Sequence, residues 1–391
     1  MQFKRSLHHF SFGSGTRNVL LVGLLSRFLV FASALIGDQL IGTRQGDDLW
    51  NLNISFINLF SRWDSGWYAS IALYGYPGGS RPINGNWAFF PLYPFLMRVF
   101  GTLSFGTLTL LQSVQVSGFF ISNILFFVAL ILFYKLSLIV LNNPKYAFVS
   151  TVFFAFWPGA FFYSAVYTES LFMTLSLAAF YLLEKEKILA STVFAFLAAL
   201  TRSSGFLVLA PFLYSDLQKR KYQTAISQTI LLFVPYVMFN VFGYFSTNVF
   251  PVSIIVEKDY WGLLSSSILQ QMFSIGFGYG LFYMVVAVLI LIPFFWFLMS
   301  EKALISQFFR RSIVDRRDFK YWFLSFGVLI VLIFFSSVYS LARYSILILP
   351  LYWVGAFILN KNHKMGVALL SIMIACLILG SILFSTWRLF M

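Results

Sequence analysis

Charge is scarce in this chain: Asp, Glu, Lys and Arg together make up 10% of its 391 residues, whereas an ordinary soluble domain carries about 25%. Hydrophobic residues make up 60%, and the mean hydropathy is +0.84. Long apolar runs recur along the whole sequence, which is typical of helices that cross a membrane. The composition excludes a soluble globular protein. It predicts an all-α polytopic membrane protein in which residues 1–391 form a single domain.

Cysteine and histidine are also scarce. The single Cys376 lies in an apolar run, and His8, His9 and His363 fall in segments that we expect in the cytoplasm. A disulfide framework and a cysteine-based metal site are therefore excluded. The sequence contains no GxxxxGKS/T, HExxH or GxSxG motif, which argues against a P-loop ATPase, a zinc hydrolase and a serine hydrolase.

The apolar runs predict about 10–11 transmembrane helices. The segment 188–214 is broken by TRSSG at 201–205, so it is either one long span or a hairpin of two short helices. The first span follows Lys4 and Arg5 without a small-residue cleavage pattern, and we interpret it as a retained span. Besides the segment 188–214, the predicted spans are 18–37, 111–141, 146–164, 168–183, 223–245, 279–300, 321–339, 344–360 and 365–387.

The distribution of positive charge favours the hairpin. With a hairpin, six segments lie on one side of the membrane and hold 17 of the 27 lysines and arginines, namely 1–17, 142–145, 184–187, 215–222, 301–320 and 361–364. This is the bias expected of cytoplasmic loops, with 1–17 as a cytoplasmic N-terminus and 301–320 as a basic cytoplasmic loop. A single span would instead put the KRK cluster outside. Topology thus accounts for the net charge of +14, and no nucleic-acid partner is expected.

The long outer loop, 38–110, is rich in Trp, Tyr, Gly and Pro, and we expect it to lie on the membrane surface with short helices. Trp67, Ile71 and Tyr74 recur at i, i+4 and i+7, which predicts one face of a short helix that ends at Gly75. The stretch FFPLYP at 89–94 is expected to turn the chain back toward the membrane.

Asp64, in RWDSGWYASIALYGY (62–76), has two interpretations. It is a general base that accepts a proton from an acceptor hydroxyl as a glycosyl bond forms, or it is the N-cap of the predicted helix. Ser65 is the alternative N-cap. The two roles are compatible, because capping uses one carboxylate oxygen.

Three more charged residues fall at the predicted outer ends of spans, where ionisable groups are costly and mark candidate functional sites. Glu169, in SAVYTESLF (164–172), either caps its helix or binds sugar hydroxyls. Arg202, in ALTRSSGF (199–206), and Arg343, in YSLARYSILILPLYW (339–353), either snorkel to the interface or bind a phosphate.

A metal site is a weaker hypothesis. Asp47 and Asp48, in QGDDLW, form an adjacent carboxylate pair of the kind that binds a divalent cation, although an exposed turn beside Gly46 is the favoured interpretation. Glu257 and Asp259 form a second outer pair, for which a solvated loop is favoured.

Five motifs in order resemble those of the PIG-V-type mannosyltransferases, a family of the GT-C class that includes GPI mannosyltransferase 2 and prokaryotic relatives. The likeness spans about residues 18–355. The motifs are RWDSGWYASIALYGY, WAFFPLYPFLMRV (87–99), YSAVYTESLFMTLSLAAFY (163–181), LAALTRSSGFLVLAPFLY (197–214) and LARYSILILPLYW (341–353).

The resemblance implies a polyprenyl- or dolichyl-phosphate-linked donor, usually of mannose, and transfer with inversion on the outer or lumenal membrane face. The acceptor would be a lipid or glycan, with no nucleotide cofactor. Trp63 and Asp64 match the family's Trp-Asp pair, so the resemblance makes Asp64 the catalytic base. Arg202 and Arg343, and next Arg62, are the candidates for holding the lipid phosphate. We expect further substrate contacts from Trp63, Trp67, Tyr68, Glu169 and Tyr344.

Two alternatives stay open. One is a GT-C enzyme for a different sugar, or one that ligates or polymerises oligosaccharides. The other is a transporter or flippase of lipid-linked sugars, which predicts polar residues at mid-membrane depth and inverted repeats. The polar residues here gather at outer helix ends and no repeat is found, so an enzyme is favoured. A prokaryotic plasma membrane is the expected location, or the endoplasmic reticulum membrane in a eukaryote.

Overall fold

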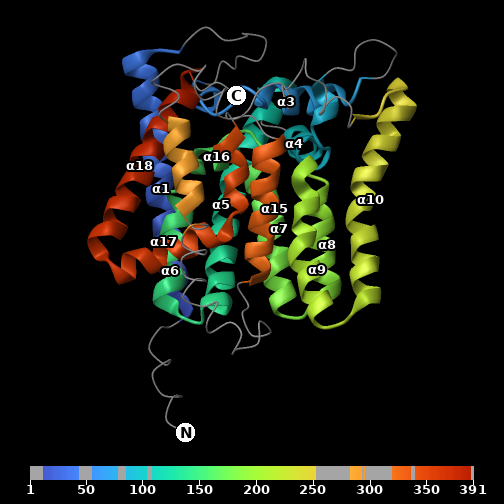
Figure 1. The fold of residues 1–391 in the computed structure, drawn as a ribbon. Coiled ribbons are helices and arrows are strands. Elements are labelled where there is room, and N and C mark those ends of the chain that lie inside the picture. Colours follow the sequence, from blue (N-terminus) through green and yellow to red (C-terminus); the bar gives the residue numbers. More distant parts are fainter. Residues whose placement is uncertain are drawn as a thin grey trace.

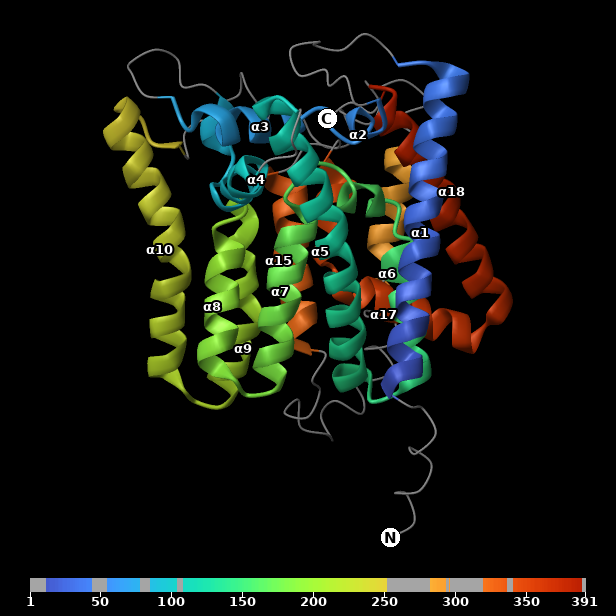
Figure 2. The same ribbon diagram turned by 180° about the vertical axis from the view of Figure 1, so that it is seen from behind.

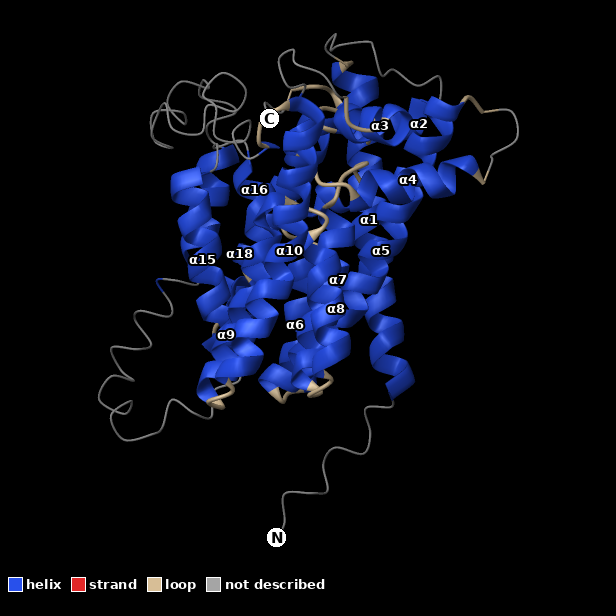
Figure 3. Cartoon of the chain, turned by 90° about the vertical axis from the view of Figure 1, so that its right-hand side faces the viewer, coloured by secondary structure: helices blue, strands red, loops and turns tan. Residues whose placement is uncertain are grey.

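A computed structural model describes residues 12–43, 55–77, 85–103, 108–251, 282–292, 295, 319–335 and 340–388. Within these ranges every regular element is helical (Figure 3), as predicted. The start of α1 lies at one end of the bundle, and the short helices of the predicted outer loop lie at the opposite end (Figure 1). These short elements are α2 (Ser55–Asn58), α3 (Ser65–Tyr74), η2 (Gly85–Ala88) and α4 (Leu92–Thr102).

Among the described residues, four helices are long and apolar enough to cross a membrane: α1 (Phe12–Ile41), α5 (Leu110–Leu141), α10 (Tyr222–Thr247) and α18 (His363–Ser385). A bent pair of helices is together long and apolar enough to make a fifth, broken span. It runs through α16 (Leu341–Tyr344), η7 (Ser345–Leu347) and α17 (Leu349–Lys361), and bends by 81° between η7 and α17. These lengths and compositions confirm an integral membrane protein.

Several other expected spans are short helices. The span expected at 146–164 is helical only as α6 (Pro144–Ala155), because Pro158 and Gly159 end the regular helix; a 3-10 turn, η3 (Ala160–Tyr163), follows. Of the span expected at 279–300, a helix is described over Phe282–Ile292. Most of the basic loop 301–320 lies outside the described residues.

A buried arginine stabilises the break after α6. Arg27 of α1 donates through Nη1 to the carbonyl of Ala160 (2.9 Å) and to Ser164 Oγ (2.8 Å), and its guanidinium lies 4.0 Å from the centre of the Phe126 ring. Carbonyls freed by a helix break inside a membrane need such donors. Arg27 therefore holds the segment that leads from α6 to the next helix.

The central helix is α7 (Glu169–Glu184), which is almost wholly buried and packs between α5 and α8 (Ile188–Ala199). Because α7 is surrounded by other helices, apolar and small residues occupy all of its faces rather than one stripe. Its N-terminus points toward the end of the bundle that carries α3 and α4 (Figure 2).

The segment 188–214 is a hairpin, as the charge distribution favoured. α8 and α9 (Leu209–Gln218) are joined by Arg202 and η4 (Ser203–Val208), and the loops before α8 and after α9 lie at the same end of the bundle (Figure 1). Lys219 Nζ and Glu186 Oε1, one from each loop, are 2.9 Å apart. At 1.5 Å per residue, α8 is about 18 Å long and too short to cross a hydrocarbon core of about 30 Å. The tip with Arg202 thus ends inside the bundle.

The predicted short helix of the outer loop is confirmed as α3, and Gly75 ends it with a φ of 72°. The buried face differs from the expected one: Tyr68, Ile71 and Ala72 are buried, whereas Tyr74 is 78% exposed. The turn at FFPLYP is followed directly by α4, whose first amide, that of Leu92, donates to the carbonyl of Leu200 at the hairpin tip (3.2 Å). The outer loop thus packs on the hairpin.

Gly205 closes the hairpin tip. A Cβ atom there would lie 2.7 Å from Ala199 Cα and 2.9 Å from the carbonyl oxygen of Ala198, so the backbone itself would have to move. We expect Gly205→Ala to destabilise the protein by about 1–3 kcal/mol, measured as a lower melting temperature in detergent. The matched control is Gly327→Ala, where the nearest atom is the flexible Cδ2 of Leu207 at 3.3 Å. Equal melting temperatures for the two variants would contradict the tight tip.

Candidate active site

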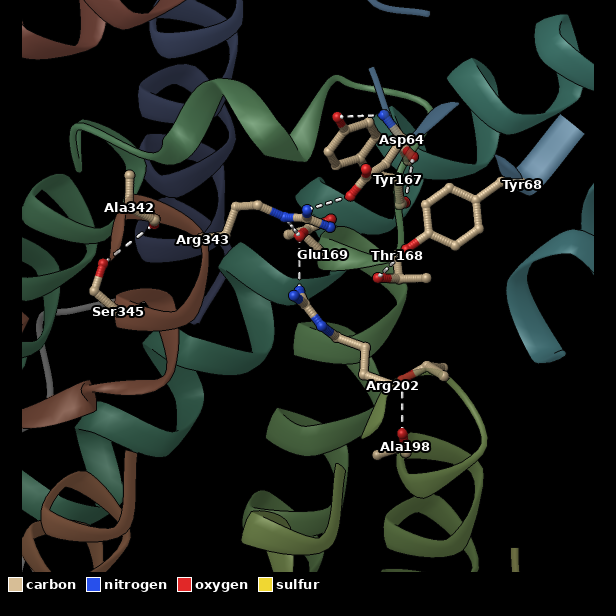
Figure 4. Close-up of polar contacts among 12 residues, drawn as sticks. Asp64, Tyr68, Tyr167, Thr168, Glu169, Ala198, Arg202, Ala342, Arg343 and Ser345 are labelled. Atoms are coloured by element: carbon tan, nitrogen blue, oxygen red, sulfur yellow. Dashed lines mark hydrogen bonds and ion pairs between the residues drawn. The ribbon is translucent and has the colours of Figure 1, made fainter. Parts of the chain in front are cut away.

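Four charged residues from distant parts of the chain meet where α3 and α7 begin (Figure 4). Asp64 directly precedes α3, Glu169 is the first residue of α7, Arg202 lies between α8 and η4, and Arg343 lies in α16. Each of them thus sits at an end or a break of a helix. There the backbone changes direction, so a side chain from each element can point to a common centre.

The four side chains form a continuous chain of ion pairs. Arg343 donates through Nη1 to Asp64 Oδ2 (2.5 Å) and through Nε to Glu169 Oε1 (2.7 Å). Arg202 donates through Nη1 to the same Glu169 oxygen (2.7 Å). Asp64, Arg202 and Arg343 are each 8% exposed, and Glu169 is fully buried. We call these four residues the acid–arginine cluster.

The charges of the cluster balance, with two carboxylates against two guanidinium groups. Balance is needed because an unpaired charge taken out of water costs several kcal/mol. Glu169 Oε2 is buried and accepts no hydrogen bond from the described residues. A carboxylate oxygen in this position can accept a hydrogen bond from a hydroxyl group of a ligand.

Backbone packing holds Arg343 in place. A Cβ atom on Gly159 would clash with the carbonyl oxygen of Ala342, so the chain just before η3 and the helix α16 approach as closely as only a glycine permits. The Arg343 guanidinium also lies 4.6 Å from the centre of the Tyr167 ring, and that of Arg202 lies 4.9 Å from the centre of the Tyr344 ring. The aromatic faces add cation–π attraction to the ion pairs.

Asp64 is not a side-chain cap. It occupies the N-cap position of α3, but its backbone is in the α region and its carboxylate makes no capping hydrogen bond. Its carbonyl oxygen accepts from the amides of Trp67 and Tyr68, and its own amide donates to the Tyr167 hydroxyl (3.1 Å). The backbone of Asp64 therefore starts the helix, and the carboxylate is directed to Arg343.

Tyr68 also faces this centre, with its hydroxyl 3.4 Å from Thr168 Oγ1. Burial raises the pKa of Tyr68 well above its ordinary value, and Arg343 lowers it by a smaller amount. The phenol stays protonated near neutral pH, so it is a neutral hydrogen-bond donor beside the cluster.

Three of the expected substrate-binding residues lie outside the cluster. Arg62 donates through Nε to the carbonyl of Ser385 (3.1 Å), and the Trp63 ring lies 4.8 Å from that of Trp387. Trp67 stacks on Phe89 at 6.2 Å. Arg62 and Trp63 thus face the end of α18, and Trp67 faces the start of the FFPLYP turn.

The metal hypothesis stays a prediction, because the structure does not describe its residues. Asp47, Asp48, Glu257 and Asp259 lie outside the described residues. Within the part of the chain that the structure describes, there is no group of three or more His, Cys, Asp and Glu side chains that could hold a metal ion.

Sequence reasoning did not identify Tyr167 and Thr168 as site residues, although both stand directly before Glu169 in the same motif. Their position before a helix that starts with a buried acid is the signal that would have identified them. Tyr167 contacts Asp64 through its hydroxyl and Arg343 through its ring.

The helix bundle, with a buried acid–arginine cluster at one end, has the GT-C fold that the sequence predicted. The fold is similar to the crystal structure of the apo oligosaccharyltransferase of Archaeoglobus fulgidus, with a TM-score of 0.50 and 11% identity over 95% of this chain and 56% of that one. The chain belongs to the family described as Mannosyltransferase (PIG-V), which matches residues 45–261. That match includes Asp64, Glu169 and Arg202 but ends before Arg343.

Curated relatives agree with this family. GPI alpha-1,6-mannosyltransferase 2 of Rattus norvegicus is 31% identical over 160 residues, which are 40% of this chain and 31% of the rat protein. The Homo sapiens protein of the same name is 28% identical over 162 residues, which are 40% of this chain and 32% of the human protein. The matched part thus spans about a third of the length of these relatives.

Glu169 is the residue on which both arginines depend. We expect Glu169→Gln to cost about 3–5 kcal/mol, because it leaves two buried guanidinium groups with one carboxylate. The double variant Glu169→Gln/Arg202→Gln restores the charge balance and should melt at a higher temperature than the single variant. Glu186→Gln, at the exposed pair with Lys219, is the control and should melt like the wild type. A double variant less stable than Glu169→Gln would show that the charges do not balance one another.

Proposed function

We propose that the protein transfers one sugar, mannose, from a polyprenyl- or dolichyl-phosphate-linked donor to a hydroxyl of a lipid or glycan acceptor. The observation that carries the proposal is the meeting of Asp64 with Arg343 and Arg202 at one buried point. Such a cluster combines a carboxylate for proton transfer with two guanidinium groups for an anionic leaving group.

In the proposed reaction, the bond between the anomeric carbon and the phosphate oxygen breaks as the acceptor oxygen bonds to that carbon from the opposite face. The acceptor proton passes to the Asp64 carboxylate, and the departing phosphate keeps the electron pair of the broken bond. General-base assistance of this kind contributes roughly 10²–10⁴-fold to a rate. No nucleotide is consumed, because the donor already carries its phosphate leaving group.

The two arginines would bind the phosphate. Planar guanidinium groups match phosphate oxygens in two-pronged contacts, and those of Arg202 and Arg343 are held by one Glu169 oxygen. The N-terminus of α7, where Glu169 lies, adds the partial positive charge of a helix end. Charge that grows on the leaving phosphate would therefore be stabilised by groups already oriented before the reaction.

Glu169 would have a second role toward the sugar. Its Oε2 has no hydrogen-bond partner among the described residues, and a donor sugar offers hydroxyl groups that could fill this place. The neutral Tyr68 hydroxyl, which lies beside Thr168, would be a further hydrogen-bond donor to the sugar. The Tyr344 ring, whose centre lies 4.9 Å from the Arg202 guanidinium, supplies aromatic surface beside the cluster, which suits the apolar face of a sugar or the start of a lipid chain.

The proposed side of the reaction is the outer or lumenal face. The basic loops 142–145, 185–187 and 219–221 lie at the end of the bundle where α1 begins (Figure 1), and there the positive-inside rule puts the cytoplasm. The cluster is nearer the opposite end. The curated relatives are named GPI alpha-1,6-mannosyltransferase 2, and these names support a lipid-linked glycan as the acceptor class.

The general base is tested by Asp64→Asn. We expect transfer of labelled mannose from polyprenyl-phosphate-mannose to fall by roughly 10²–10⁴-fold in membranes with matched protein levels, because Asn does not accept the proton. Asp38→Asn is the control: Asp38 lies near the same end of the bundle and accepts a hydrogen bond from Thr43 Oγ1 (2.8 Å). Equal transfer by Asp64→Asn and wild type would remove Asp64 as base. Passage of the donor across the bilayer without transfer would favour a transporter.

Binding of the lipid phosphate is tested without catalysis. Arg343→Gln should weaken binding of polyprenyl phosphate by about tenfold, close to 1.4 kcal/mol, since one guanidinium is lost. Asp64→Asn should strengthen binding by a similar factor, because Asp64 competes with the phosphate for Arg343 Nη1. The measurement is a titration in nanodiscs. An unchanged affinity in both variants would place the phosphate elsewhere.

A further inference from the structure

The last turn of α18 and the residues just after it lie against the segment that precedes Asp64. Arg62 donates through Nε to the carbonyl of Ser385 (3.1 Å), and its guanidinium lies 5.5 Å from the centre of the Trp387 ring. The rings of Trp63 and Trp387 lie 4.8 Å apart, tilted by 53°. Two consecutive residues before Asp64 thus contact a part of the chain that is more than 300 residues away.

Both tryptophans have an unusual backbone. Trp63 has a φ of 53° and Trp387 a φ of 58°, in the left-handed region that bulky side chains rarely adopt. Such a conformation costs free energy and persists only where its surroundings hold it. The contact between the two rings is an interaction that holds both.

A second contact joins the same part of α18 to Asp64. The Phe384 ring lies 5.8 Å from the Tyr167 ring at 81°, and the Tyr167 hydroxyl accepts the hydrogen bond of the Asp64 amide. Asp64 is therefore supported on both sides by residues that contact the end of α18: Trp63 through the chain and Tyr167 through a hydrogen bond.

The end of α18 is itself fixed. Ser385 Oγ donates to the carbonyl of Ala34 in α1 (3.4 Å), and Arg388 Nη2 donates to that of Ile41 (3.5 Å). α18 packs against α1. Because α1 and α18 both cross the membrane, Trp387 stands on a rigid support rather than on a free end.

We propose that Trp387 is a positioning residue: it holds Trp63 in its left-handed conformation, and this directs the Asp64 carboxylate to Arg343. Trp387 takes no part in the proposed reaction itself, and its positioning role rests on Asp64 as the proposed base. Trp387 also lies outside the family match at 45–261. Without the indole of Trp387, Trp63 is free to relax to an ordinary backbone conformation. Asp64, the next residue, then turns away from the cluster.

The test is hydrogen exchange of the full-length protein in nanodiscs, followed by mass spectrometry of a peptide over residues 59–68. We expect Trp387→Ala to speed exchange in this peptide by about tenfold, because the amides of Asp64, Ser65 and Gly66 lose their fixed partners, while peptides of α7 stay protected. Trp387→Phe keeps a ring against Trp63 and should exchange like the wild type. Trp87→Ala, which removes a buried indole from the same end of the bundle, is the matched control and should leave 59–68 unchanged.

Conservative variants keep the test decisive if Trp387→Ala does not fold. In a double-mutant cycle, Trp63→Leu and Trp387→Leu, which lose the ring but keep apolar volume, should each speed exchange at 59–68 and should do so non-additively, as residues in contact do. Additive effects, or wild-type exchange in this peptide for Trp387→Leu and for any Trp387→Ala protein that folds, would overturn the proposal. If mannose transfer is detected, Trp387→Ala should lower kcat and leave the KM for the donor unchanged. The exchange result stands whether or not the proposed transfer is observed.

Discussion

The arrangement of the helices around the acid–arginine cluster depends on the pairing of its buried charges. Glu169 is enclosed by the helix bundle, and a carboxylate there is tolerable only with cations in contact. Arg202 and Arg343 supply them, and Asp64 balances the second arginine. Since each partner comes from a different segment, the cluster fixes the relative positions of the outer loop, α7, the hairpin and the broken span. Loss of one charge therefore affects the packing of several elements at once.

The irregular parts of the fold follow from this requirement. A continuous helix that crosses the membrane presents its side chains sideways, whereas four side chains that converge on one point need chain ends or breaks. α6 stops at Ala155, the hairpin turns at Arg202, and the span containing Arg343 bends by 81°. Each break frees backbone groups that need hydrogen bonds within a membrane. Arg27 supplies them after α6, which explains a buried arginine with no carboxylate beside it.

The sequence was sufficient to predict a helical membrane protein, the hairpin, α3 and the residues of the cluster, because charge is so rare here that every acid and arginine is conspicuous. It was insufficient for their pairing, since Asp64 and Arg343 are 279 residues apart and no local pattern relates them. Arg62 was assigned to the phosphate, and its observed partner is a carbonyl of α18 whose position no motif indicates. The break after α6 was missed although Pro158-Gly159 marks it. Tyr167 was missed because a phenol among apolar residues is typical of packing.

The separation of the cluster residues along the chain also dictates an order of membrane insertion. Glu169 is made before either arginine. Arg202 follows it by 33 residues within the adjoining hairpin, so these two enter the bilayer as a neighbouring pair. Arg343 follows Glu169 by 174 residues, and until it arrives Asp64 has no partner in the cluster. The insertion machinery therefore handles a chain in which the Asp64 carboxylate must stay in a polar environment through most of synthesis. The acid–arginine cluster is complete only after Arg343 has been made.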